Sequence, residues 1–192
     1  MLRIKLLFAG LLGSAALAAP AAAAYEIDPL TREPLSPFGS YAPQAAAIPR
    51  ELVSYRGPHA PGTVIISTPE RRLYYVLGGG QAIRYAVGVG RPGFTWGGSK
   101  PITRKAEWPS WTPPAQMLRR RPDLPRFMKG GPDNPLGARA LYLGSSLYRI
   151  HGSNEPETIG QAVSSGCIRM LNEDVVDLYE RVRVGTRVVV QR

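Results

Sequence analysis

A single cysteine, and a histidine sixteen residues before it, are the residues best suited to nucleophilic chemistry in this sequence. Cys167 is the only cysteine among 192 residues, and His151 is one of two histidines. A thiol is a strong nucleophile only as its thiolate, and an imidazole within hydrogen-bonding reach can accept the thiol proton. The other histidine, His59, lies in a proline-rich stretch. The pattern therefore predicts Cys167 as a nucleophile and His151 as its base; the alternative is an inert thiol buried in the core.

The residues before the cysteine form a turn suited to binding a negatively charged oxygen. Ser164, Ser165 and Gly166 precede Cys167 directly. Glycine permits a tight turn and lets a substrate carbonyl approach the main-chain amides, so we expect the amides of Gly166 and Cys167 to stabilise an oxyanion. The two serines are expected to form the turn first and to contact substrate second. No acidic residue flanks His151, so a main-chain carbonyl is expected to orient its ring.

Short strands and few helices are predicted around these residues. Runs of β-branched and aromatic residues predict strands at 63–67, 71–77, 81–89, 140–143, 147–151 and 186–190. Helices are predicted at 172–182, capped by Asn172, at 114–120, and at 158–163, capped by Thr158. The proline- and glycine-rich segment 91–134 is expected to be a loop that covers a groove. The fold class is thus mainly β, with β-sandwich-like mixed sheets, one helix in the C-terminal half and short helices.

The N-terminal residues have the three-part plan of an export signal. A basic start at 1–5 precedes an apolar run at 6–19 and a small-residue stretch at 21–24. We therefore predict a signal peptide at 1–24, the alternative being an uncleaved anchor helix. Residues 25–61 are rich in proline and alanine and predict an extended linker or arm. The remaining residues, 62–192, suit one domain, which we expect to be a monomer.

Charge and cysteine content narrow the classes of partner. The formal net charge is +10, and removing Arg3 and Lys5 with the signal leaves 10 − 2 = +8. Such a surface favours an anionic partner or matrix, or serves solubility alone. Lysine and arginine are scattered apart from the run at 119–121, so nucleic acid is not an expected partner. An exported protein usually pairs its cysteines, so one unpaired thiol is either incidental to the core or reactive.

One long motif resembles a known family. The run HGSNEPETIGQAVSSGCIRM, at 151–170, is similar to the signature of the L,D-transpeptidase catalytic domain, also called the YkuD domain. That signature is His-Gly-Thr/Ser followed some fifteen residues later by Ser-x-Gly-Cys-Ile/Val-Arg-Met. The resemblance extends over about 62–190, through 63–67, 85–90, 108–114 and 134–137, and it does not include the signal or the arm.

The resemblance implies a role for each residue of the motif. Cys167 corresponds to the acylated nucleophile, His151 to its base, and the Gly152 carbonyl to the group that orients the imidazole. The amides of Ser165, Gly166 and Cys167 correspond to the oxyanion donors. Arg169 corresponds to the arginine that shapes or charges the substrate site. Arg169 has the alternative of a surface ion pair with Glu173 or Asp174, and Ser164 remains a second candidate for substrate contact.

The resemblance also implies a reaction and a location. A peptidoglycan stem tetrapeptide would acylate the cysteine and release D-Ala. An amine would then accept the acyl group, giving a 3-3 cross-link, an attached protein terminus or an exchanged D-amino acid. No metal or other cofactor is implied, carbapenem-type inhibitors are expected to acylate the thiol, and the location is the periplasm, associated with the cell wall. The alternatives are a carboxypeptidase or endopeptidase hydrolase and a non-catalytic peptidoglycan-binding module.

Overall fold

The computed structural model describes residues 26–27, 34–35 and 48–192. The predicted signal and most of the predicted arm lie outside the described residues. The chain divides into two units, at 1–42 and 43–192. In the first unit, β1 (Glu26–Ile27) pairs antiparallel with β2 (Pro34–Leu35). All other described elements belong to the second unit, which contains the predicted site.

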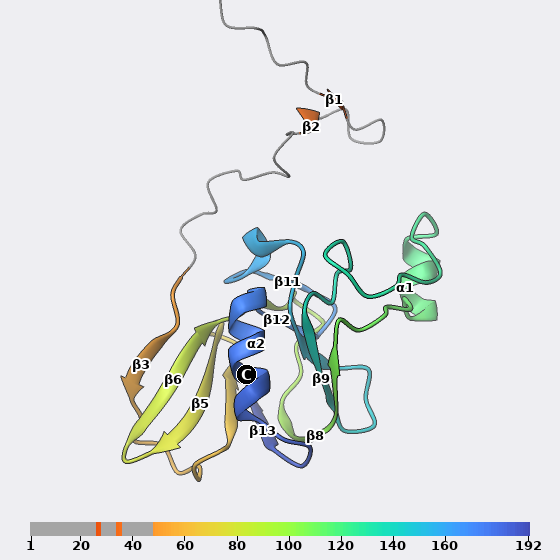
Figure 1. Cartoon of the computed structure of the whole chain (residues 1–192). Helices are drawn as coiled ribbons and strands as arrows, with labels where there is room; N and C mark the ends of the chain where they lie inside the picture. The colour runs from red at the N-terminus through yellow and green to blue at the C-terminus, as the bar shows by residue number, and fades with distance from the viewer. Residues whose placement is uncertain (1–25, 28–33, 36–47) are drawn as a thin grey trace, which may run out of the picture. The chain divides into compact units, whose positions relative to one another are not determined.

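A mixed sheet of nine strands is the framework of residues 48–192 (Figure 1). In sheet order the strands are β12 (Ile168–Arg169), β10 (Arg149–His151), β9 (Arg139–Leu143), β8 (Gly98–Glu107), β13 (Arg187–Gln191), β4 (Val64–Ser67), β5 (Arg72–Gly78), β6 (Gln81–Ala86) and β3 (Glu51–Ser54). The pairs β10–β12 and β13–β4 are parallel, and the other pairs are antiparallel. A separate parallel pair joins β7 (Val89–Gly90) to β11 (Ala162–Ser164).

One amphipathic helix covers the sheet. Figure 1 shows α2 (Asn172–Arg181) lying across the strands, and its Val175 and Leu178 are fully buried. Acidic residues occupy its first turn and Arg181 its last, as the helix dipole favours. The shorter elements are α1 (Ala115–Arg120) and one 3-10 turn, η1 (Pro156–Thr158). No helix among the described residues is long and apolar enough to cross a membrane.

The core lies between α2 and the sheet and includes buried residues of β10 and β12. Its members share complete or nearly complete burial and come from most of the strands. They include Val64, Ile66, Leu73, Tyr85, Val87, Ile102, Leu141, Leu143, Ile150, Ile168, Met170, Val175, Leu178 and Val188. The mainly β class with mixed pairing and few helices is therefore confirmed, as are strands close to the predicted positions at 63–67, 71–77, 140–143 and 186–190.

Three segments differ from the sequence-based expectations. The helix expected at 158–163 is absent, because Gly160 has a φ of +84° and the chain continues into β11 instead. The segment expected to be a loop contains β8, whose first residues pair with β13 and whose later residues pair with β9. Within the expected arm, β3 pairs with β6 and forms an edge of the sheet.

Candidate active site

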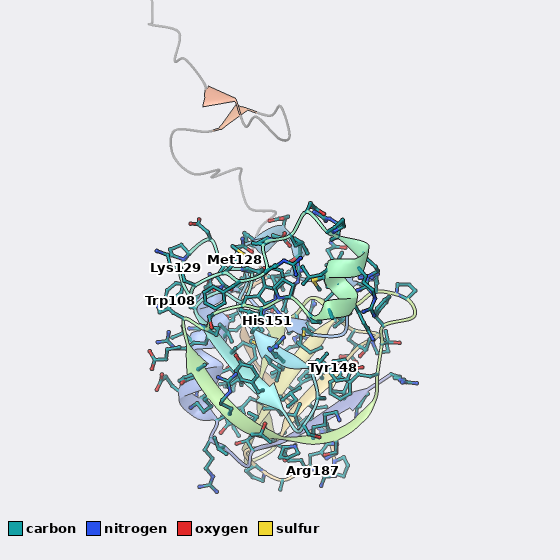
Figure 2. All side chains as sticks on the ribbon, turned by 90° about the vertical axis from the view of Figure 1, so that its right-hand side faces the viewer. Trp108, Met128, Lys129, Tyr148, His151 and Arg187 are labelled. Atoms are coloured by element: carbon teal, nitrogen blue, oxygen red, sulfur yellow. The ribbon has the colours of Figure 1, made fainter. Side chains whose placement is uncertain are left out.

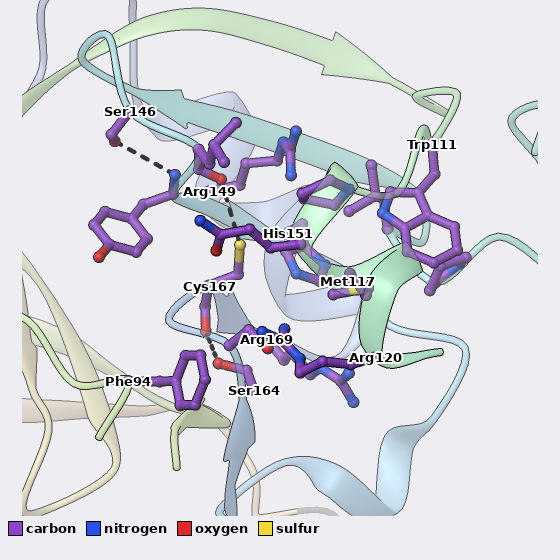
Figure 3. A pocket seen from close by; sticks show the side chains of 17 residues that line it. Phe94, Trp111, Met117, Arg120, Ser146, Arg149, His151, Ser164, Cys167 and Arg169 are labelled. Atoms are coloured by element: carbon purple, nitrogen blue, oxygen red, sulfur yellow. Dashed lines mark hydrogen bonds between the residues drawn. The ribbon is translucent and has the colours of Figure 1, made fainter. Parts of the chain in front are cut away.

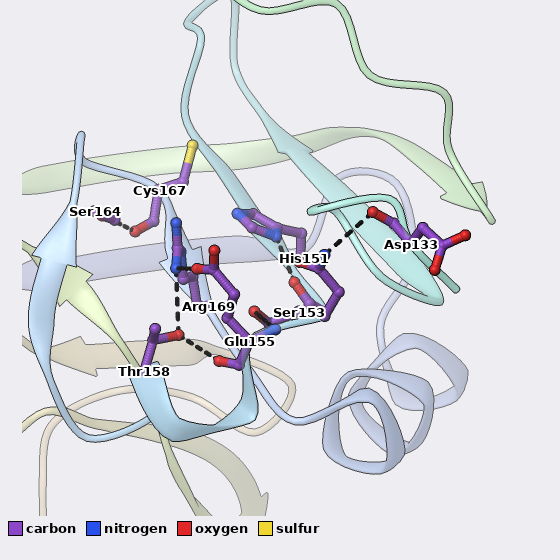
Figure 4. Close-up of polar contacts among 10 residues, drawn as sticks. Asp133, His151, Ser153, Glu155, Thr158, Ser164, Cys167 and Arg169 are labelled. Carbon is purple, nitrogen blue, oxygen red and sulfur yellow. Dashed lines mark hydrogen bonds and ion pairs between the residues drawn. The ribbon is translucent and has the colours of Figure 1, made fainter. Parts of the chain in front are cut away.

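Two parallel strands place the predicted nucleophile and base on one face of the sheet. Ile150 of β10 pairs with Ile168 of β12, and His151 pairs with Arg169. Both isoleucines are buried in the core. Because successive side chains of a strand point to opposite faces, His151 and Arg169 point away from that core. Cys167 directly precedes Ile168, and Figure 4 shows it beside His151 on the neighbouring strand.

The His151 ring is held as a neutral base. Its side chain is buried, and its Nδ1 lies 2.5 Å from the Gly152 carbonyl oxygen. A carbonyl oxygen only accepts, so this contact assigns the proton to Nδ1 and leaves Nε2 free to accept one. Burial lowers the pKa of His151 to about 4; the Gly152 hydrogen bond opposes this shift, and the charges of Arg169 and Arg149 add to it.

The Cys167 thiol is also neutral at rest. It is partly buried, and its Sγ donates to the Leu147 carbonyl oxygen at 3.7 Å. Burial raises the pKa of this thiol, while the charge of Arg149 opposes the increase. Within residues 48–192, no hydrogen bond joins the sulfur to His151. The resting pair is therefore a thiol beside an imidazole, rather than a preformed thiolate and imidazolium.

Aromatic residues hold the turn that carries the cysteine. Gly166 has a φ of +106°, and Trp96 donates its indole N–H to the Gly166 carbonyl at 2.8 Å. Trp96 also stacks on Tyr148, with ring centroids 4.5 Å apart and an interplanar angle of 5°. A Cβ atom at Gly166 would lie 2.6 Å from the Tyr148 ring. Sequence reasoning missed both aromatic residues, because nothing in their local spacing connects them with the cysteine.

Hydrogen bonds within the turn change the expected set of oxyanion donors. The Gly166 amide, expected to be free, donates to Ser164 Oγ at 3.0 Å. Ser164 Oγ in turn donates to the Cys167 carbonyl at 2.6 Å, so this buried hydroxyl stabilises the turn and is not free for substrate. In the described part of the chain, the amides of Ser165 and Cys167 have no acceptor. These two amides remain as available donors.

Asn172 supports the residues around His151 instead of capping a helix. The N-cap position of α2 is Leu171, and Asn172 is the first helical residue. Its Oδ1 accepts from the Ala138 amide at 2.9 Å, and its Nδ2 donates to the Ser153 carbonyl at 3.1 Å. Its side chain passes so close to Gly152 that a Cβ atom there would overlap it. Position 152, whose carbonyl oxygen contacts His151 Nδ1, therefore needs a glycine.

Arg169 makes an ion pair with Glu155. Its Nη1 lies 2.5 Å from Glu155 Oε2, whereas the alternative to a substrate role was an ion pair with Glu173 or Asp174. The same nitrogen contacts Thr158 Oγ1 at 3.3 Å, as Figure 4 shows. Thr158 therefore supports Arg169 rather than capping a helix. The main chain of Arg169 pairs with Gly88, which links β12 to the β7 region.

The candidate residues open into one pocket of about 400 Å³ (Figure 3). Cys167, His151, Arg149, Ser165 and Arg169 line it, together with residues of α1 and of the segment before it. The residues from α1 and that segment are Trp111, Pro114, Gln116, Met117 and Arg120. The part of 91–134 that was expected to cover a groove thus borders this pocket. Among the described residues, no cluster of three His, Cys, Asp or Glu side chains is arranged to hold a metal ion.

The segment that carries α1 is closed at its base by main-chain hydrogen bonds. Trp111 and Met128 exchange two of them, each 2.8 Å long. Figure 2 shows α1 above the end of the strand that carries His151, with Met128 on the neighbouring loop. Trp111 lines the pocket, whereas Trp108 is exposed.

Substitution of Gly166 by alanine is expected to destabilise the protein and to displace the cysteine. The positive φ costs about 1–2 kcal/mol for an L-residue, and the collision with Tyr148 adds about 1–3 kcal/mol. The matched control is Gly185→Ala, because Gly185 has a φ of +92° and open space around its Cβ position. Chemical denaturation should show the larger loss for Gly166→Ala. Equal losses for the two variants would contradict the role assigned to the Tyr148 contact.

Comparison with known proteins identifies the family. Residues 61–190 match the family model described as the L,D-transpeptidase catalytic domain, YkuD. The probable L,D-transpeptidase YbiS of Escherichia coli K12 is 41% identical over 149 residues, which cover 73% of this chain and 47% of that protein. The chain thus spans about half the length of this relative. It belongs to the L,D-transpeptidase catalytic domain family.

Two solved structures are similar to this chain. A Brucella melitensis protein, named a probable carnitine operon oxidoreductase, is 44% identical with a TM-score of 0.51, covering 74% of this chain and 93% of that one. The activity in that name refers to the Brucella protein alone. L,D-transpeptidase 3 from Mycobacterium tuberculosis, in complex with a faropenem-derived adduct, has a TM-score of 0.53 at 20% identity, covering 68% of this chain and 60% of that one. This second likeness concerns the fold.

Proposed function

We propose that the protein is a peptidoglycan L,D-transpeptidase that works through a Cys167 thioester. The observation that supports this most directly is the placement of Cys167 and His151 on one face of two paired strands, lining the same pocket. Family membership supports the same reaction class. The substrate proposed is a stem tetrapeptide that ends in diaminopimelate and D-Ala.

Acylation begins with transfer of the thiol proton. His151 Nε2 accepts the proton as the Cys167 sulfur attacks the carbonyl carbon at the L-centre of diaminopimelate. Because the Cys167 thiol and the His151 imidazole are both neutral before reaction, the proton moves to His151 as the sulfur attacks. A carbon–sulfur bond forms, the carbon–nitrogen bond to D-Ala breaks, and the imidazolium returns the proton to the departing amine. The Gly152 carbonyl keeps the imidazole in the tautomer that this cycle needs.

The tetrahedral intermediate carries a negative oxygen that needs donors. The free amides of Ser165 and Cys167 are suited to this, because preorganised N–H groups stabilise charge that develops during reaction. The Gly166 amide and Ser164 hydroxyl instead fix the shape of the turn. The Arg169 guanidinium, paired with Glu155, forms a fixed wall of the substrate site.

The second half of the cycle transfers the acyl group to an amine. The acceptor amine attacks the thioester, the carbon–sulfur bond breaks, and the sulfur recovers its proton through His151. A second stem, a protein terminus or a free D-amino acid each offers such an amine, whereas water would give hydrolysis. Export at residues 1–24 and a periplasmic, wall-associated location belong to this proposal. So does acylation of Cys167 by carbapenems, in keeping with the penem-derived adduct on the Mycobacterium tuberculosis relative.

Product masses test the proposed reaction. The purified protein is incubated with a disaccharide tetrapeptide, with and without D-methionine, in ¹⁸O-labelled water. Transfer predicts a product in which D-methionine replaces D-Ala, together with a stem dimer lacking one D-Ala. A tripeptide that contains ¹⁸O as the sole product would favour the hydrolase alternative. If the substrate stays unchanged while the protein co-sediments with peptidoglycan sacculi, the non-catalytic binding module would be favoured.

A further inference from the structure

A guanidinium at the pocket wall has no carboxylate partner among residues 48–192. The Nε atom of Arg149 is buried and has no hydrogen-bond partner within residues 48–192. In the same part of the chain Arg149 makes no ion pair, whereas Arg169 pairs with Glu155. Because Arg149 is only half-buried and lines the pocket, its remaining N–H groups can bind an anionic ligand that supplies the missing counter-charge.

The strand register places this guanidinium beside the sulfur. Arg149 precedes Ile150, which pairs with Ile168, so Arg149 is level with Cys167 on the neighbouring strand. Alternation along β10 puts the Arg149 side chain on the same face as His151. Both Arg149 and Cys167 line the pocket, as Figure 3 shows.

Aromatic contact keeps the Arg149 side chain in place. Its guanidinium carbon lies 5.3 Å from the centre of the Tyr142 ring on β9, the strand next to β10. A guanidinium held over a ring by a cation–π contact still has N–H groups available for a carboxylate. The site is therefore preformed and positively charged, and its natural ligand is an anion with two oxygens.

We infer that Arg149 binds the terminal carboxylate of the residue that leaves, and so selects donor stems ending one residue beyond the scissile bond. This inference rests on the proposed transpeptidase function. When the sulfur attacks the carbonyl before D-Ala, the carboxylate of D-Ala lies only one residue away from the attacked atom. A guanidinium level with the sulfur is within reach of that carboxylate. A donor that continues past this residue, or ends in an amide, offers no anion there and leaves Arg149 unpaired.

Two donors that differ only at the terminal group test the inference. One is the stem tetrapeptide with its free carboxylate, and the other is the same peptide with a terminal carboxamide. The parent protein should prefer the acid in kcat/KM by on the order of tenfold or more, the usual advantage of a charge-assisted bidentate pair. Arg149→Gln should bring the acid-to-amide ratio close to one by slowing only the acid donor. Arg149→Lys should give an intermediate ratio, because lysine keeps the charge but not the fork.

A neighbouring arginine provides the control. Arg104 stacks on the same Tyr142 ring at 3.5 Å, but it is exposed and does not line the pocket. Arg104→Gln should keep the parent's ratio and rate. If Arg149→Gln fails to fold, the Arg149→Lys ratio decides the question.

Three results would separate the possible failures. Equal rates for both donors with the parent protein would overturn the inference and leave the transpeptidase function intact. An Arg149→Gln variant that slows both donors by the same factor would also overturn it, since Arg149 would then act on the sulfur or the fold. No turnover of either donor by the parent would overturn the proposed function, and this inference with it.

Discussion

Replacing Cys167 with alanine should abolish acyl transfer and prevent any carbapenem adduct while the protein remains folded. The sulfur is the only atom of the pocket proposed to form a bond with the acyl group, so its removal leaves no covalent route. The side chain is partly buried and makes one weak hydrogen bond, to Leu147, so its loss should change the unfolding temperature little. Intact-protein mass after carbapenem exposure, together with thermal unfolding, provides the two measurements.

Serine provides the matched variant at the same position. Cys167→Ser keeps the size and shape of the side chain, but a hydroxyl is a far weaker acid than a thiol, so we expect no measurable turnover. A carbapenem adduct of unchanged mass on Cys167→Ala would show that another residue is acylated. That result would remove the basis of the thioester mechanism.

Replacing His151 with glutamine should slow acylation by about 10²–10⁴-fold, the usual contribution of a positioned general base. The thiol stays in place but loses its proton acceptor, so the variant should still react slowly with a carbapenem at raised pH, where some thiolate forms without help. Stopped-flow or timed mass measurements of acylation give the rate. The control is His59→Gln, which changes the other histidine outside the pocket. A loss below tenfold for His151→Gln would contradict the base role.

The same variant should also change how stability depends on pH. The folded pKa of His151, about 4, lies below the ordinary value of 6.5, so the unfolded chain binds more protons between these values. Stability due to this group is therefore fully present above about pH 6.5 and is lost as pH falls toward 4. The full difference is about 3 kcal/mol. Denaturation across this range should show a shallower acid slope for His151→Gln than for the parent or His59→Gln.

Local patterns in the sequence predicted several of the strands. The strands near 63–67 and 140–143 consist of β-branched and apolar residues, which favour extended structure wherever they pack. The nearness of Cys167 and His151 followed from a motif rather than from periodicity, because the fifteen intervening residues include a 3-10 turn and strand β11, which pairs with the distant β7. The roles proposed for these residues remain predictions.

Pairing between distant segments accounts for what the sequence did not predict. Strand β8 contains Gly98 and Pro101, and only Ile102 within it is fully buried, so it lacks the alternation that marks a strand. It forms because β13 and β9 each pair with one half of it. Asn172 has the residue type and position of a helix cap, but Ala138 and Ser153 offer its side chain better-placed partners. Local sequence cannot show which of these contacts the Asn172 side chain makes, because Ala138 and Ser153 come close to it only in the folded chain.

The contact between Trp96 and the cysteine turn gives the molecule an intrinsic optical signal. The indole is nearly buried, stacked on Tyr148 and hydrogen bonded to the residue before Cys167. Indole emission depends on both the polarity and the hydrogen bonding of its surroundings. Any ligand that shifts the Gly166 carbonyl while reacting at the sulfur therefore alters the fluorescence of the protein, without an added dye.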